Sequence, residues 1–165
     1  MGITLGQVSA DPVSPKTVLV VDDDRPMRAL CRASLEEAGF RVLEAAGGEE
    51  ALESVRAERP DLILLDVMMP GISGWEVTSA LLADRSTDQI PIIFISARRE
   101  LADRMRAFEL GAHGYLTKPF DPDQLAETVA IVLDEIERGE RHAALAETLT
   151  ALRKEQISAG KQPPS

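Results

Sequence analysis

Acidic, hydroxyl and lysine side chains follow apolar runs of strand length in this 165-residue chain. They are Asp22, Asp23 and Asp24 after VLVV, Asp66 after LILL, Ser96 after IIFI, and Lys118 after GYLT. In an open parallel sheet, functional groups gather where the carboxyl ends of the strands meet. We therefore expect these side chains to form one site.

The chemistry of such a site follows from its charges. Carboxylates held close together repel and raise one another's pKa unless a cation neutralises them. An all-oxygen site with room for water suits Mg²⁺, and Mn²⁺ is also possible. The metal and the ammonium group of Lys118 would bind an anion, and the hydroxyl of Ser96 would hydrogen-bond one of its oxygens. This arrangement favours phosphoryl transfer to a carboxylate, which forms an acyl phosphate.

The elements that position these side chains are read from the hydrophobic pattern. Five apolar runs predict strands, and five segments with helical periodicity predict helices between and after them. The strands are expected at 17–21, 40–45, 61–66, 91–96 and 113–117, and the helices at 25–38, 48–58, 74–84, 99–110 and 122–138. The alternation predicts an α/β fold, a doubly wound five-stranded parallel sheet with helices on both faces.

The pattern also predicts how the chain is organised. Residues 1–16 are expected to be a flexible leader, 17–138 the domain, 139–157 a helical extension, and 158–165 a disordered tail. Leu145, Leu149 and Leu152 form one stripe in the extension. Extension of the preceding helix, dimerisation and docking on the domain all stay open, and the interrupted stripe favours a modest contact over a stable coiled coil.

Composition excludes several classes of protein. The net charge of −10 argues against nucleic-acid binding by these residues, because phosphate backbones require clustered Lys and Arg. The single cysteine, Cys31, excludes a disulfide framework and a multi-cysteine metal site. The longest apolar runs have the length of strands and are too short to cross a membrane. Cytoplasmic residence is the expectation.

Four separated motifs carry a resemblance to a known family. VLVVDDD at 18–24, LILLDVMMPGISG at 62–74, IIFISA at 92–97 and GYLTKPF at 114–120 are similar to the motif regions of the receiver domain of two-component response regulators, the CheY-like superfamily. The resemblance implies the flavodoxin-like strand order 2-1-3-4-5. It also implies phosphorelay signalling: a sensor histidine kinase or phosphotransfer protein donates a phosphoryl group, and protein–protein interactions then switch.

The resemblance implies a role for each acid of the site. Asp66 would be the phospho-acceptor. Asp23 would bind Mg²⁺ directly, Asp22 would hold metal-bound water, and the backbone carbonyl of Met68 would be a further ligand. Asp24 is an additional acid, and helix capping ahead of Pro26 is its expected role.

The remaining roles implied by the resemblance concern switching. Ser96 takes the hydroxyl position, Lys118 pairs with the phosphoryl group, and Tyr115 falls on the aromatic switch position. The Lys118–Pro119 bond is expected to be cis. The readout would appear on the surface formed by the fourth helix, the fifth strand and the fifth helix, with a homodimer possible on phosphorylation.

Two positions depart from the common family pattern. Ser73 stands where the family often has Asp, and Ser73 and Glu76 have the spacing of a capping box. Met68 and Arg98 stand at the positions whose side chains flank the attacking water, and neither is an acid or an amide that would position it. We therefore expect the phosphoryl group to survive well against hydrolysis.

Two other functions stay open at this point. A haloacid-dehalogenase-type phosphohydrolase would use Asp22 and Asp24 as its D-x-D pair, but it would leave Asp66 without a role. A non-phosphorylated pseudo-receiver would serve as a binding scaffold. The leading interpretation is a signalling domain that phosphorylates itself and turns over no substrate. The cognate kinase and the downstream target are unknown.

Overall fold

A computed structural model of the chain describes residues 14–139 and 150–155. Most of the predicted leader, residues 140–149 and 156–157 of the predicted extension, and the predicted tail lie outside these ranges, as do Leu145 and Leu149. In the part that is described, no helix is both long and apolar enough to cross a membrane.

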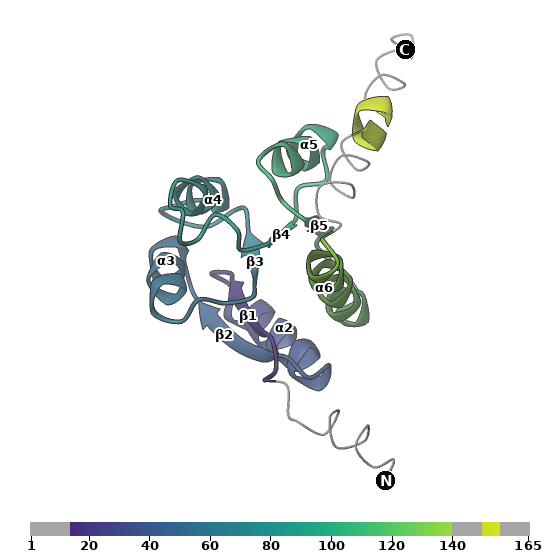
Figure 1. Cartoon of the computed structure of the whole chain (residues 1–165). Helices are drawn as coiled ribbons and strands as arrows, with labels where there is room; N and C mark the ends of the chain where they lie inside the picture. Colours follow the sequence, from purple (N-terminus) through teal and green to yellow (C-terminus); the bar gives the residue numbers. More distant parts are fainter. Residues whose placement is uncertain (1–13, 140–149, 156–165) are drawn as a thin grey trace.

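Five parallel strands form one sheet in the order β2-β1-β3-β4-β5 (Figure 1). The strands are β1 (Thr17–Val21), β2 (Arg41–Ala45), β3 (Leu62–Asp66), β4 (Ile92–Ser96) and β5 (Gly114–Thr117). The predicted fold class and strand order are confirmed. β1 and β3 pair in register, with Val21 opposite Leu65, so both strands end at the same edge of the sheet.

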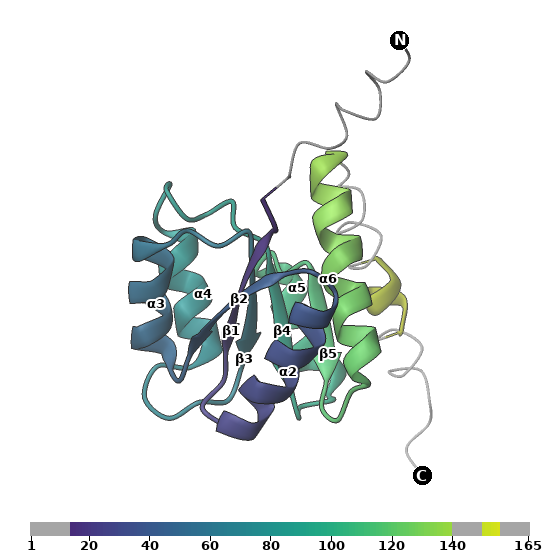
Figure 2. The ribbon, with the colours of Figure 1, turned by 90° about the horizontal axis from the view of Figure 1, so that it is seen from below.

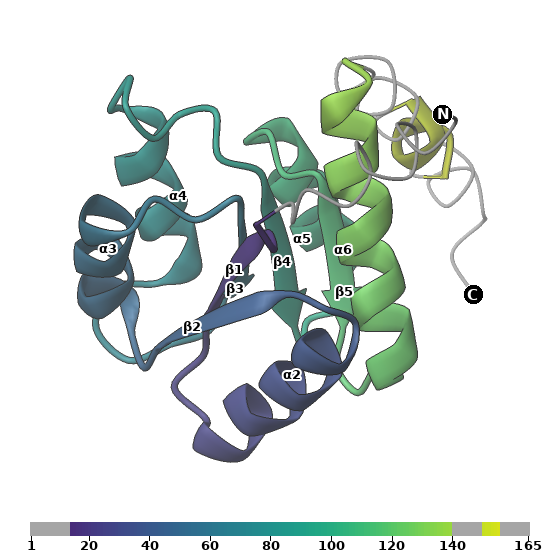
Figure 3. The same cartoon turned by 60° about the horizontal axis from the view of Figure 1, so that its bottom comes forward.

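Helices cover both faces of the sheet (Figure 2). They are α2 (Arg25–Glu37), α3 (Gly48–Ala57), α4 (Gly74–Leu82), α5 (Leu101–Glu109) and α6 (Pro122–Glu137), and residues 150–155 are also helical. Helices α2 and α6 lie on one face of the sheet, and α3, α4 and α5 lie on the other (Figure 3). Their apolar side chains form two core clusters, one on each face.

The strands contribute alternate residues to these two layers of the core. In β1, Leu19 and Val21 face one layer, while Val18 and Val20 face the other. All five residues of β3 and of β4 are buried. Burial on both faces explains why β1, β3 and β4 appear in the sequence as continuous apolar runs rather than as alternating patterns.

Two details differ from the sequence-based expectations. Helix α5 begins at Leu101, two residues later than predicted, because the backbone of Glu100 is extended at φ −61° and ψ 140°. The helical periodicity of 25–38 places Leu30 beside Cys31 on the apolar face, as the sequence pattern predicts, but Leu30 is 40% exposed. Met27, Cys31 and Leu35 are spaced by four residues and suffice to line the contact with the sheet, so Leu30 falls beside it.

Candidate functional site

Three carboxylates meet at the carboxyl edge of the sheet. Asp22 and Asp23 directly follow β1, and Asp66 ends the neighbouring strand β3. One oxygen from each of the three lies within 4.8 Å of the other two. Asp22 and Asp66 are 1% and 4% exposed, whereas Asp23 is exposed to solvent. The structure thus brings together the three acids that the sequence predicts as one metal-binding group.

Lys118 places a positive charge among these acids. Its Nζ lies 2.7 Å from Oδ2 of Asp22 and 3.5 Å from Oδ2 of Asp66. Burial alone would lower the pKa of Lys118, but the hydrogen bond to Asp22 and the charges of Asp66 and Asp22 raise it, so the ammonium form is favoured. The Lys118–Pro119 peptide bond is cis, as the resemblance implies.

Asp66 is less acidic than an ordinary aspartate. Burial and the charge of Asp22 raise its pKa to about 6, while Lys118 and the amide N–H of Met68 act in the opposite direction. One lysine therefore leaves two buried carboxylates incompletely compensated. A hard divalent cation held by oxygen ligands would supply the missing positive charge. The charge, geometry and donor atoms of the group all fit Mg²⁺.

This charge imbalance predicts that Asp66→Asn stabilises the metal-free protein at neutral pH. The folded-state pKa of Asp66 is raised, so the ionised form destabilises the fold above about pH 6 and has no effect below about pH 4, where both states are protonated. We expect the free energy of unfolding in urea at pH 8 to rise by about 1–3 kcal/mol, and the difference to vanish in acid. A wild type as stable as the variant at pH 8 would contradict this.

The loop after β4 links the predicted switch residues. The buried hydroxyl oxygen of Ser96 accepts a hydrogen bond from the amide of Arg98 at 3.0 Å. The half-buried Tyr115 donates its hydroxyl hydrogen to the carbonyl oxygen of Arg98 at 2.8 Å. The backbone of Arg98 thus links the hydroxyl of Ser96 to the hydroxyl of Tyr115.

Met68 and Arg98 meet over the mouth of the site. Met68 is 53% exposed, and Nε of Arg98 lies 3.0 Å from its sulfur atom. Arg98 also forms an exposed ion pair with Asp103 at 3.4 Å. Thioether and guanidinium groups carry no base that could activate a water molecule. The positions predicted to flank an attacking water therefore hold no acid or amide.

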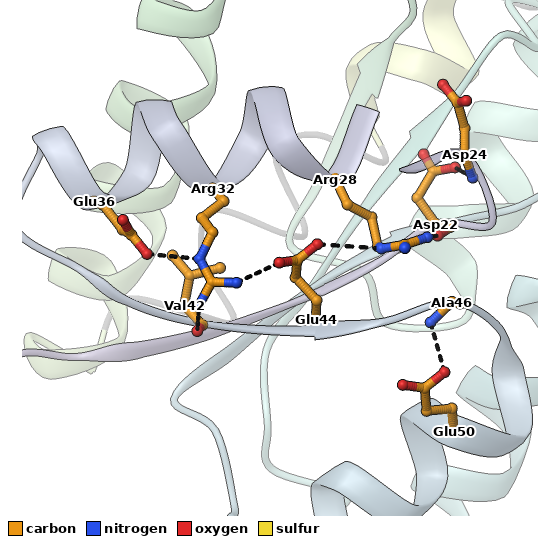
Figure 4. A network of polar contacts seen from close by, with 9 residues as sticks. All are labelled: Asp22, Asp24, Arg28, Arg32, Glu36, Val42, Glu44, Ala46 and Glu50. Carbon is orange, nitrogen blue, oxygen red and sulfur yellow. Dashed lines mark hydrogen bonds and ion pairs between the residues drawn. The ribbon is translucent and has the colours of Figure 1, made fainter. Parts of the chain in front are cut away.

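Arg28 supports the acidic loop in a way that the sequence pattern does not reveal. Its Nη1 donates to the carbonyl oxygen of Asp22 at 2.8 Å, and its Nε pairs with Glu44 at 3.2 Å (Figure 4). Glu44 also pairs with Arg32, which contacts Glu36 on the same helix (Figure 4). This network ties α2 and β2 to the backbone of Asp22. Contacts between residues of separate elements leave no spacing signal in the sequence.

The two predicted helix caps have different outcomes. Ser73 caps α4, because its hydroxyl oxygen accepts a hydrogen bond from the amide of Glu76 at 3.3 Å. Asp24 occupies the cap position of α2, but its side chain makes no capping hydrogen bond, so that prediction is wrong. Instead, Oδ1 of Asp22 accepts from the amide of Asp24 at 2.9 Å, which fixes the turn between β1 and α2.

Gly74 sets the distance between α4 and the acceptor strand. A Cβ atom at this position would lie 2.4 Å from the carbonyl oxygen of Asp66 and 2.9 Å from Cα of Val67. Both contacts are with backbone, which cannot rotate away. We expect Gly74→Ala to lower the free energy of unfolding by about 1–3 kcal/mol in thermal or urea denaturation. Gly47→Ala is the control, because a Cβ there meets nothing within 4 Å; equal losses in both variants would contradict the prediction.

Comparison with known protein families favours the receiver interpretation over the phosphohydrolase. Residues 18–130 match the family model described as the response regulator receiver domain. The chain belongs to the response regulator receiver domain family. The matched region contains the acid cluster, Ser96 and Lys118 together. Receiver domains act in phosphorelay signalling, which is therefore the function of this family member.

Curated relatives of this receiver domain are longer proteins. The phosphate regulon transcriptional regulatory protein PhoB of Pseudomonas aeruginosa is 40% identical over 130 residues, which cover 79% of this chain and 57% of PhoB. The alkaline phosphatase synthesis transcriptional regulatory protein PhoP of Bacillus subtilis is 41% identical, over 72% of this chain and 48% of PhoP. The chain thus spans about half the length of these curated relatives.

Solved structures agree with the fold. Chemotaxis protein CheY4 of Vibrio cholerae superposes with a TM-score of 0.68 at 33% identity, over 72% of this chain and 98% of that protein. A CheY-like receiver domain protein of Methanospirillum hungatei superposes with a TM-score of 0.71 at 29% identity, over 76% of this chain and 99% of that protein.

Proposed function

We propose that this receiver domain accepts a phosphoryl group on Asp66 from a histidine kinase or phosphotransfer protein. The observation that carries the proposal is the position of Asp66. It is the one carboxylate at the end of the central strand β3, and it lies within reach of two further acids and a lysine. Asp22, Asp23, Asp66 and the Met68 carbonyl would hold Mg²⁺, with Mn²⁺ as a substitute. Bound metal supplies positive charge that stabilises the phosphoryl oxygens.

Side chains of the domain would carry out the transfer itself. A carboxylate oxygen of Asp66 attacks phosphorus, and the bond to the donor's leaving atom breaks as the new O–P bond forms. Lys118, already 3.5 Å from Asp66, would shift from the buried acids toward the charge on the transferred group. The Ser96 hydroxyl would donate a hydrogen bond to another phosphoryl oxygen. Lys118 is already beside the acceptor, whereas Ser96 accepts a hydrogen bond from the amide of Arg98 before the donor arrives.

Incubation with Mg²⁺ and a small-molecule phosphodonor tests the proposal. Intact-mass analysis should show one added phosphoryl group on the wild type and none on Asp66→Asn. Asp24→Asn is the matched control: it removes a neighbouring acid outside the three-carboxylate group and should be phosphorylated as the wild type is. An unmodified wild type, or a modified Asp66→Asn protein, would overturn the proposal.

The output is proposed to be a change in protein–protein contacts on the surface of α5, β5 and α6, with homodimerisation as one form of it. Phosphate removal would be slow self-hydrolysis without turnover of any other substrate. Membership of this family supports a cytoplasmic location and a protein rather than nucleic-acid partner for these residues. The regulators PhoB and PhoP are described as transcriptional, and any such activity here would require residues outside this domain.

The side chain of Met68 is expected to prolong the lifetime of the phosphoryl group. An amide side chain at this position would hydrogen-bond a water molecule placed for attack on the phosphorus atom. The thioether of Met68 forms no such hydrogen bond. Met68→Asn should therefore speed dephosphorylation by about 10-fold. This is less than the roughly 100-fold to 10,000-fold of a general acid or base, because an amide positions the water without taking its proton. The rate is measured by loss of added mass after removal of the donor. Met68→Leu is the apolar control, and equal rates for Met68→Asn and the wild type would refute the expectation.

A further inference from the structure

Residues 150–155 lie against the domain beside α5 (Figure 1). Oε1 of Glu155 pairs with Nη2 of Arg104 at 3.2 Å, across 51 residues of sequence. Leu152 is only 7% exposed, whereas Ala151 and residues 153–155 are exposed. The buried Leu152 gives the segment one apolar side. The ion pair of Glu155 with Arg104 is the contact that places the segment on the domain.

The face of α5 that meets this segment is distinct from its core-facing side. Ala107 points into the core of the sheet, while Arg106 stacks over Trp75 of α4 at 4.5 Å. At the spacing of an α-helix, Arg104 lies on the flank of α5 opposite Arg106, and Met105 lies on the face turned away from Ala107. Met105 and Leu152 are both buried, yet neither belongs to the two clusters that cover the sheet. Segment 150–155 therefore supplies a third, smaller contact on the outer face of α5.

Arg104 connects this contact to the site. It lines a pocket together with Arg99, Thr117 and Pro119, at the end of β5 that carries Lys118. Arg99 donates to the carbonyl oxygen of Lys118 at 3.5 Å, so the guanidinium group of Arg99 faces the same pocket. Glu155 thus neutralises one of two arginines gathered there. The acidic side chain of Glu155 therefore complements the positive charge of the two arginines on this face of the domain.

The start of α5 is also tied to the hydroxyl of Ser96. The amide of Arg98 donates to that hydroxyl, and α5 begins three residues later at Leu101. If the Ser96 side chain rotates about χ1 to carry its oxygen toward a phosphoryl group on Asp66, that oxygen moves away from the amide of Arg98 and their hydrogen bond is lost. The loop that leads into α5, and with it the position of Arg104, then loses one of its anchors.

We propose that residues 150–155 are a tethered occupant of the outer face of α5, and that phosphorylation of Asp66 weakens this contact. The inference rests on the proposed function. In the unphosphorylated protein the segment covers part of the α5–β5 surface, and a protein partner or second copy must displace it. Phosphorylation lowers the free energy needed for that displacement, because it loosens the Ser96–Arg98 connection. The α5–β5 surface is then free to bind the partner.

Hydrogen exchange of the full chain, followed by mass spectrometry, tests the contact itself. Glu155→Gln should raise exchange in residues 150–155 by about 2-fold to 5-fold, the range for an exposed ion pair. Leu152→Ser should raise it by at least about 10-fold, because it removes the buried apolar group. Lys154→Gln is the control, since this exposed lysine forms no ion pair among the described residues. Equal exchange in the wild type and Leu152→Ser would overturn the proposal.

The same measurement on protein treated with Mg²⁺ and phosphodonor tests the release. Exchange in residues 150–155 should rise by at least about 5-fold over Mg²⁺ alone, the lower end of ordinary allosteric coupling. Asp66→Asn should show no rise. Protein that carries the added phosphoryl mass but keeps unchanged exchange would overturn this inference and leave the proposed function intact. Protein that gains no mass would overturn the proposed function, and the release step with it.

Discussion

Lys118→Met should be phosphorylated about 100-fold to 1,000-fold more slowly than the wild type, the effect of removing one charge-stabilising donor from a transition state. Two reasons come from the geometry. The ammonium group is the sole cation within 3.5 Å of the acceptor among the described residues, so the transferred oxygens lose their nearest side-chain positive charge. The loss also leaves the buried pair Asp22 and Asp66 without a counterion, which raises the cost of ionising the nucleophile.

A change of rate has to be separated from a loss of folding. Lys118→Arg keeps a positive charge beside the two acids, so it should fold as the wild type does. It should recover only part of the phosphorylation rate, because a planar guanidinium group does not reproduce a compact ammonium group. Lys16→Met removes an exposed lysine paired with Glu137 at 3.4 Å, far from the site in the fold, and should leave the rate unchanged. Folding of each variant is checked by circular dichroism in Mg²⁺. A folded Lys118→Met protein with the wild-type rate would contradict the assigned role.

Asp23→Asn should weaken Mg²⁺ binding by at least about 100-fold. Asp23 is the exposed acid of the group, so it can exchange water for metal, and its charge is one of three that attract the cation. Losses of 10-fold to 100-fold are typical even for residues that only support a ligand, and a direct ligand should cost more. The measurement is the rise in unfolding temperature with Mg²⁺ concentration, which follows the fraction bound.

Asp24→Asn is the matched control for this second prediction. Asp24 is adjacent in sequence and also exposed, but it lies outside the three-carboxylate group. It should keep the Mg²⁺-dependent rise in unfolding temperature. Without metal, Asp23→Asn should be no less stable than the wild type, because it removes a repelling charge. Equal responses to Mg²⁺ in Asp23→Asn and Asp24→Asn would show that Asp23 is not a ligand.

The fold was largely predictable because its strands are buried on both faces. That burial imposes continuous apolar runs, and helices between them imply parallel pairing. The order of the strands came from the family resemblance rather than from periodicity. The late start of α5 was missed because an arginine and a glutamate, Arg99 and Glu100, suit helix and loop equally well.

The site was predictable to the extent that its residues end strands. Asp22, Asp23 and Asp66 follow apolar runs, so they converge once β1 and β3 are neighbouring parallel strands. Arg28 was not predictable, because its bonds to the Asp22 carbonyl and to Glu44 depend on how α2 crosses the sheet. Docking of residues 150–155 was one of three open alternatives, and the sequence could not single it out because the Arg104–Glu155 pair joins residues 51 positions apart.

The chemical identity of the acceptor tests the central claim most directly. Borohydride reduces an aspartyl phosphate to homoserine, and peptide mass spectrometry then locates the altered residue. After treatment with Mg²⁺ and phosphodonor, we predict homoserine at position 66 and at no other aspartate. Homoserine at Asp22, the position that a haloacid-dehalogenase-type nucleophile would occupy, or at Asp24 would contradict the account.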